Sequence, residues 1–135
     1  MDDDPVVIVD DATPPRALLA VSTFEQLEVL STHVERAGWE VDAAERGIEL
    51  IERVPAEEVD LAVIDLPLLG SLGFRLLEVL RVVRPECLLV LIDTLGSSRE
   101  TALEAGADGV IDGRDVSDLL RLLREGRRSS VSTNH

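Results

Sequence analysis

The sequence predicts an α/β fold in which helices cover both faces of a parallel sheet. From residue 16 onward, short aliphatic runs alternate with amphipathic segments that carry helix-capping residues, a pattern typical of βαβ units. Two of the runs, LAVID at 61–65 and CLLVLI at 87–92, show no polar alternation, as expected of strands buried on both faces. A chain of 135 residues, 45% of them hydrophobic, is expected to form one domain with a substantial core.

The first strand and the first helix are expected at 17–21 and 24–37. The strand is the aliphatic run ALLAV. Ser22 or Thr23 is the expected N-cap of the helix, and Gly38 stands just past its end. The apolar positions on the inward face of this helix are Phe24, Leu27, Leu30 and Val34.

Four more βα units are expected along the chain. The strands are expected at 39–43, 61–65, 87–92 and 109–111, and the helices at 45–54, 73–84, 97–105 and 115–125. Pro55 and Pro85 are expected to stop the second and third helices, and Gly106 follows the fourth. The apolar positions expected to face inward on these helices are Ile48, Leu50, Ile51, Leu76, Leu80, Val83, Val116, Leu119, Leu120 and Leu123.

The composition excludes several classes of function. The formal net charge is −14, and so acidic a surface repels nucleic acid and anionic lipid. No apolar run approaches the roughly 20 residues that a membrane-spanning helix needs. The single Cys87 excludes a disulfide framework and fits a reducing compartment, so we expect a cytoplasmic protein without nucleic-acid or membrane partners. Residues 1–15 are expected to form an acidic extension and residues 126–135 a tail or linker, which leaves 16–125 for the folded domain.

Three segments resemble the receiver domains of response regulators. The segment DLAVIDLPLLGSLGFRLLEVLR (60–81) is similar to the third strand and following loop of that family, with Asp65 ending the strand and Gly73 eight residues on. The segment AGWEVDAAERGIELIE (37–52) resembles the second strand and helix, and ALEAGADGVID (102–112) resembles the fourth helix and fifth strand. The resemblance implies a flavodoxin-like, doubly wound (βα)5 fold with strand order 2-1-3-4-5.

The resemblance also implies a site at the carboxyl ends of the strands. In the family, the Asp that ends the third strand is phosphorylated, which makes Asp65 the phosphoacceptor-equivalent residue. Family members surround this nucleophile with an acidic pair that holds Mg²⁺, a hydroxyl, a Lys and a switch aromatic. The positions that match these helpers carry other residues here: Ser22 and Thr23 for the acidic pair, Ile92 or Asp93 for the hydroxyl, Gly113 for the Lys and Val110 for the aromatic. The chain contains no Lys at all.

The choice of the first strand decides whether a metal site is expected. Two aliphatic runs compete, because Val6–Val9 precedes ALLAV. The spacing to Trp39 fits one ordinary helix only if ALLAV is the strand. The alternative needs a helix of about twenty-three residues, capped by Thr13 with Pro14 at its first position, or a helix with a break. We therefore expect no metal site and no cofactor. The alternative assignment gives a Mg²⁺ site made of Asp10, Asp11 and Asp65.

The sequence thus favours a pseudo-receiver, an atypical receiver domain that is not an enzyme and acts in signal transduction as a phosphorylation-independent protein-interaction module. Its partner is expected to be another protein or a second copy of the chain. The apolar residues expected to contribute to the contact surface are Leu68, Leu69, Leu72, Phe74, Val82 and Leu122. The alternative function is a Mg²⁺-dependent response regulator phosphorylated on Asp65, with Asp10 and Asp11 as its acidic pair.

Overall fold

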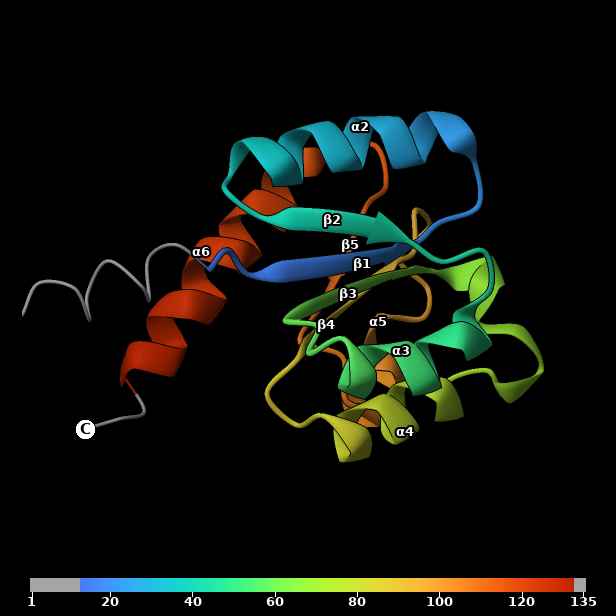
Figure 1. Ribbon diagram of the computed structural model, residues 1–135. Coiled ribbons are helices and arrows are strands. Elements are labelled where there is room, and N and C mark those ends of the chain that lie inside the picture. The colour runs from blue at the N-terminus through green and yellow to red at the C-terminus, as the bar shows by residue number, and fades with distance from the viewer. Residues whose placement is uncertain (1–12, 133–135) are drawn as a thin grey trace, which may run out of the picture.

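Five parallel strands form one sheet in the order β2-β1-β3-β4-β5 (Figure 1). The strands are β1 (Arg16–Ala20), β2 (Glu40–Ala43), β3 (Leu61–Asp65), β4 (Leu88–Ile92) and β5 (Gly109–Ile111). This is a computed structural model, and it describes residues 13–132. The predicted doubly wound, flavodoxin-like fold is confirmed, and each strand lies within one residue of its predicted bounds.

Helices cover both faces of the sheet. They are α2 (Phe24–Arg36), η1 (Gly47–Glu49), α3 (Leu50–Ala56), η2 (Leu66–Leu72), α4 (Arg75–Val83), α5 (Arg99–Ala105) and α6 (Val116–Ser132). On one face α2 packs beside α6, and on the other α4 packs between α3 and α5 (Figure 1). Within residues 13–132, no helix combines the length and the apolar character that crossing a bilayer requires. The core therefore has two layers, one against α2 and α6 and one against α3, α4 and α5.

β1 lies in the interior of the sheet, between β2 and β3. Leu19 of this strand pairs with Ala43 of β2 on one side and with Val63 of β3 on the other. Its side chain is fully buried, as an aliphatic residue of a strand covered on both faces should be. The assignment of ALLAV to the first strand is confirmed, and the alternative that gave this place to Val6–Val9 is wrong. The stretch Val6–Val9 itself lies outside the described residues.

Four helical segments differ from the prediction, among them α5, which begins at Arg99 and not at 97. The second helix is divided into η1 and α3, and Pro55 lies within the last turn of α3 instead of beyond it. The 3-10 segment η2 precedes α4, which begins at Arg75 because Gly73 has φ +59° and ψ −141°, outside the helical region. The last helix was expected to end at 125, but α6 continues to Ser132. No proline interrupts that stretch, and a helix that has nucleated extends at little cost per residue.

The predicted inward faces are wrong at three positions. Phe24, the first residue of α2, is 71% exposed, and Val83, the last residue of α4, is 37% exposed. Ile48 is 48% exposed because it lies in η1, where three residues per turn replace the α-helical period that placed it inward. Leu77 of α4 is fully buried although it was not assigned to the inward face.

The side chain of Arg81 joins the loops that precede β4 and β5 to α4. Its Nη1 atom donates to the carbonyls of Pro85 and Cys87 at 2.7 and 3.1 Å. Its Nη2 atom donates to the carbonyl of Gly106 and to the carboxylate of Asp108, at 2.6 Å each. Because one guanidinium satisfies three main-chain carbonyls and a carboxylate, it fixes this end of the sheet relative to α4.

Candidate functional site

The carboxyl ends of the strands bring the predicted site residues to one edge of the sheet, where parallel α/β sheets carry their sites. Asp65 ends β3 and pairs with Ile92, which ends β4. The backbone N–H of Ser22, just after β1, donates to Oδ2 of Asp65 at 3.2 Å. Ser22 and Asp65 are therefore neighbours, and the main chain satisfies one oxygen of this carboxylate.

Thr23 caps the N-terminus of α2. Its hydroxyl oxygen accepts the backbone N–H of Gln26 at 3.1 Å, and its extended backbone, φ −124° and ψ 151°, is the usual geometry of an N-cap. Of the two residues predicted as the cap, Thr23 has this role. The hydroxyl oxygen at one of the acidic-pair positions is thereby held at the end of the helix.

The end of β4 is occupied by an aliphatic side chain and a buried acid. Ile92 is 1% exposed, so the predicted hydroxyl position carries a core residue. Asp93 is 5% exposed, and a buried carboxylate is tolerated only with hydrogen bonds. Its Oδ2 accepts the backbone N–H of Ser98 at 2.8 Å, and its own N–H donates to the carbonyl of Ile111 at 2.9 Å. Asp93 therefore anchors the loop between β4 and α5.

At the position that matches the Lys, the side chains of Gln26 and Ile92 occupy the space that a side chain would need. A Cβ atom built on Gly113 would lie 2.3 Å from Nε2 of Gln26 and 2.9 Å from Cγ2 of Ile92. The side chain of Gln26, in the first turn of α2, therefore covers the main chain at Gly113. Gln26 was missed in the sequence, although its place one turn past the cap puts it at the edge of the sheet that carries the site.

The side chains of Arg114 and Val110, at the end of β5, make contacts within the domain. Arg114 follows Gly113, and its Nε and Nη2 atoms donate to the carboxylate of Asp112 at 3.1 and 3.0 Å. These hydrogen bonds lower the pKa of Asp112 below its ordinary value. Val110, at the position of the switch aromatic, is half-buried and packs against the core on the α4 side of the sheet.

Within residues 13–132, the groups around Asp65 do not make up a set of oxygen ligands for Mg²⁺. That ion takes oxygen ligands in octahedral geometry, with carboxylates as the protein's contribution. The carboxylate of Asp65 instead accepts the N–H of Ser22, and residues 13–132 contain no group of three or more His, Cys, Asp or Glu side chains that could hold a metal. Asp10 and Asp11, the other members of the alternative metal site, lie outside the described residues.

The apolar residues predicted for a contact surface do not gather on one exposed face. Three of them are half-buried and pack against the core: Leu68, Leu72 and Phe74. Leu69 is 5% exposed, so its prediction as a surface residue is wrong, because η2 turns its side chain inward. Leu122 packs over Gly109 of β5, and its Cδ1 atom would lie 2.5 Å from a Cβ atom built on that glycine. Val82 is 77% exposed, as predicted, and Leu95, which was not predicted, is 89% exposed.

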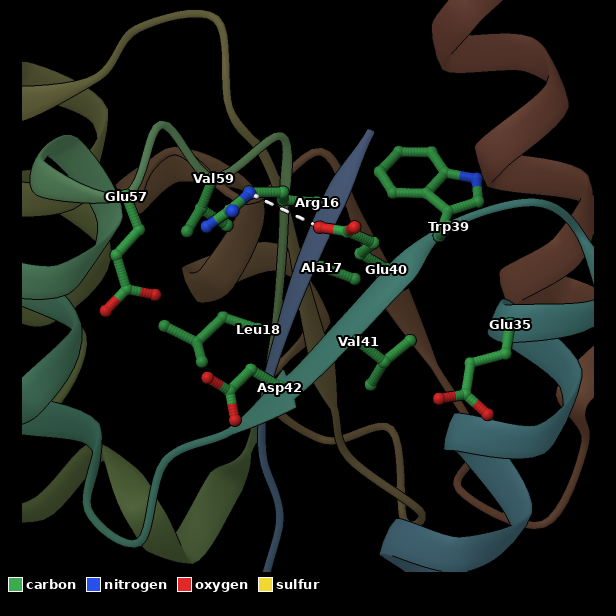
Figure 2. A pocket seen from close by; sticks show the side chains of 10 residues that line it. All are labelled: Arg16, Ala17, Leu18, Glu35, Trp39, Glu40, Val41, Asp42, Glu57 and Val59. Atoms are coloured by element: carbon green, nitrogen blue, oxygen red, sulfur yellow. Dashed lines mark ion pairs between the residues drawn. The ribbon is translucent and has the colours of Figure 1, made fainter. Parts of the chain in front are cut away.

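A separate hollow of about 400 Å³ lies beside the edge strand β2. Figure 2 shows that carboxylates surround it, and they belong to Glu35, Glu40, Asp42 and Glu57. Arg16 pairs with Glu40 at 3.6 Å. Arg53 pairs with both Asp42 and Glu57 at 2.8 Å. Arginines of the chain therefore hold three of the four carboxylates, and the hollow remains acidic overall.

Comparisons with known proteins agree with this architecture. The family model described as the response regulator receiver domain matches residues 6–124. The chain is 33% identical over 98 residues to the transcriptional regulatory protein GltR of Pseudomonas aeruginosa, which covers 69% of this chain and 40% of that protein. It is 28% identical over 97 residues to a cyclic di-GMP phosphodiesterase of Thermotoga maritima, which covers 70% of this chain and 26% of that protein. The chain thus spans less than half the length of these two relatives.

Solved structures show the same fold. A putative response regulator from Chloroflexus aurantiacus superposes with a TM-score of 0.75 at 21% identity, covering 84% of this chain and 98% of that chain. A CheY-like response regulator receiver domain protein from Methanospirillum hungatei superposes with a TM-score of 0.69 at 25% identity, covering 87% of this chain and 99% of that chain. The matched family range begins ahead of β1 and ends within α6.

Proposed function

The chain belongs to the response regulator receiver domain family, and on that premise we propose that it acts as a pseudo-receiver in two-component signalling. Its output is the binding of a protein partner or of a second copy of the chain, and that output does not depend on phosphorylation of Asp65. The domain is not an enzyme and takes no cofactor. The curated relatives are longer proteins, so the output of any larger assembly is part of this proposal.

The observation that carries the proposal is the state of the Asp65 carboxylate and its surroundings. Transfer of a phosphoryl group depends on positioned positive charge, supplied by a divalent cation and cationic side chains. Here the carboxylate of Asp65 accepts a hydrogen bond from the N–H of Ser22. Gln26 covers Gly113 at the Lys position, and the guanidinium of Arg114 is bound to Asp112. These contacts leave little positive charge to stabilise an aspartyl phosphate.

The chemical nature of the surface supports a protein partner. A net charge of −14 repels nucleic acid and anionic membranes. Exposed apolar side chains, of which Val82 and Leu95 are the most exposed on the α4 and α5 side, are the groups that protein partners bury. The fold keeps its stability without the phosphorylation chemistry, because burial in the two core layers stabilises it.

A phosphorylation assay tests the proposal directly. The chain is incubated with Mg²⁺ and a small phosphoryl donor such as phosphoramidate, and the intact mass is followed over time. In parallel, amide chemical shifts are recorded with Mg²⁺ and beryllofluoride, which mimics the phosphoryl group. We expect no mass increase and no shift localised around Asp65. Stoichiometric modification that Asp65→Asn abolishes and Asp93→Asn preserves would overturn the proposal.

Phosphorylation of Asp65 in this assay would support the alternative function, a Mg²⁺-dependent response regulator. If the modification needs Mg²⁺ and is lost in Asp10→Asn or Asp11→Asn, the chain is a phosphoacceptor that completes its metal site with residues ahead of β1. The family match that begins at residue 6 favours testing these two positions.

A further inference from the structure

A groove of about 400 Å³ opens between the C-terminal end of α2 and the side of α6. Its floor is apolar, because Trp39 and Leu123 are 5% and 3% exposed and Leu120 is half-buried beside them. Its rim is basic and consists of His33, Arg36 and Arg124. The apolar floor of the groove is the outer part of the core layer against α2 and α6, and none of its lining residues belongs to the site around Asp65.

The basic rim is unusual for so acidic a chain. Most arginines in residues 13–125 are held by carboxylates, as Arg53 and Arg81 are. Arg36 and Arg124 are exposed and form no ion pair with another described residue, yet both line this one groove. Two cations beside an apolar floor predict an occupant that is itself apolar with acidic flanks.

The chain enters the described structure close to this groove. The carbonyl of Pro15 accepts the backbone N–H of Glu40 at 2.9 Å, and Glu40 follows the groove residue Trp39. Figure 1 shows the start of β1, the C-terminal end of α2 and α6 on the same side of the molecule. Whatever precedes residue 13 therefore begins next to the groove.

The sequence ahead of this point has the chemistry that the groove predicts. Val6–Val9 are four consecutive aliphatic residues, with Asp2–Asp4 on one flank and Asp10 and Asp11 on the other. We propose that Val6–Val9 of the same chain dock on the apolar floor between α2 and α6, with the flanking aspartates paired to Arg36 and Arg124. This proposal does not rest on the proposed function, because it involves neither Asp65 nor the strand ends around it.

The reach of the chain permits this contact. Six residues separate Val9 from Arg16, and an extended chain covers about 20 Å in that length. The facing stretches of the two helices, 33–37 and 120–124, each span little more than one turn, about 6 Å. The hollow beside β2 in Figure 2 is equally near, but its carboxylates repel the flanking aspartates.

Paramagnetic relaxation tests the docking in the full chain. A nitroxide is attached at Pro5→Cys in a Cys87→Ala background, so that one thiol reacts, and amide signals are compared with the nitroxide oxidised and reduced. We expect the signals of residues 33–37 and 120–124 to lose most of their intensity, and those of α4 to keep theirs. Val7→Asp combined with Ile8→Asp should restore the groove signals, because charged residues do not enter an apolar floor.

Charge reversal on the rim provides the matched comparison. Arg36→Glu combined with Arg124→Glu should reduce the docked fraction severalfold, whereas Arg75→Glu, an exposed arginine on α4, should leave it unchanged. Circular dichroism checks that each variant is folded.

Three results would overturn the proposal. The first is undiminished groove signals, and the second is broadening confined to the residues that line the hollow in Figure 2. The third is broadening that appears only between chains, measured by mixing isotope-labelled chain without nitroxide and unlabelled chain with it, since the occupant would then be a second copy.

Discussion

Raising the pH above 9 is expected to destabilise this protein through a single side chain, Cys87. This residue precedes β4 and is fully buried in the core layer against α3, α4 and α5. Burial raises the pKa of its thiol from 9.0 to about 12, because the thiolate would lose its hydration. The sequence contains no Lys and no Tyr, and arginine titrates only above about pH 12. No other side chain therefore changes charge between pH 9 and 11.

The direction of the effect follows from counting protons. Above pH 9 the unfolded chain has lost the thiol proton and the folded chain has kept it, so unfolding releases a proton and the free energy of unfolding falls as the pH rises. Each pH unit between the two pKa values lowers the free energy of unfolding by about 1.4 kcal/mol, which amounts to about 2–3 kcal/mol at pH 11. That is a large part of the 5–15 kcal/mol that is typical of a domain.

Urea unfolding followed by far-ultraviolet circular dichroism at a series of pH values measures this slope. Thiolate absorbance gives an independent reading of the folded-state pKa, because no tyrosinate absorbs in this chain. Cys87→Ala should lose about 1 kcal/mol at neutral pH through its smaller side chain, and its stability should then be flat from pH 9 to 11. An equally steep fall in Cys87→Ala, or a flat profile in the unsubstituted chain, would refute the reasoning.

Three further substitutions test the packing and hydrogen bonds described above. Leu77→Ala removes a fully buried side chain of α4 and should cost about 2–5 kcal/mol in urea unfolding, while Val82→Ala on the same helix, 77% exposed, should stay within about 0.5 kcal/mol. Thr23→Ala removes the cap of α2 and should lower the free energy of unfolding by about 1 kcal/mol, a loss that Thr23→Ser should largely avoid. Arg81→Ala strips donors from three carbonyls and from Asp108 and should cost about 1–3 kcal/mol; a thermal midpoint unchanged from the parent chain would contradict the role given to this guanidinium.

The strands could be predicted closely because their signal is local. A strand buried on both faces reads as a nearly continuous apolar run, and LAVI in 61–64 and LLVLI in 88–92 are such runs. The competition between Val6–Val9 and ALLAV was settled by a different local constraint, namely the length of chain that one crossover helix needs before Trp39. The right-handedness of βαβ crossovers then leaves few possible strand orders. Among these, the resemblance to receiver domains predicted the order 2-1-3-4-5 that the structure shows.

The site was predicted less completely than the strands. In loops and short 3-10 segments, no repeating pattern in the sequence indicates which side chains point toward the core. Leu69 and Ile48 lie in 3-10 segments, where a helical projection assigns the wrong face. Leu122 was placed off the inward face of its helix, but β5 contains Gly109 and leaves space that Leu122 fills. The contact between Gln26 and Gly113 joins residues far apart in the chain, so only a three-dimensional structure could bring it to notice.

The interior position of β1, between β2 and β3, has a consequence for how the chain folds during synthesis. β1 is the first strand of the sheet to leave the ribosome, yet it needs β3 as well as β2 to satisfy its main chain. Translation proceeds at about 5–20 residues per second, so the hydrophobic strand β1 has an unpaired edge for several seconds before β3 emerges. Nascent chains arrested before Leu61 should therefore remain unstructured and bind chaperones. The acidic residues near β1 in the sequence oppose aggregation of such intermediates through charge repulsion.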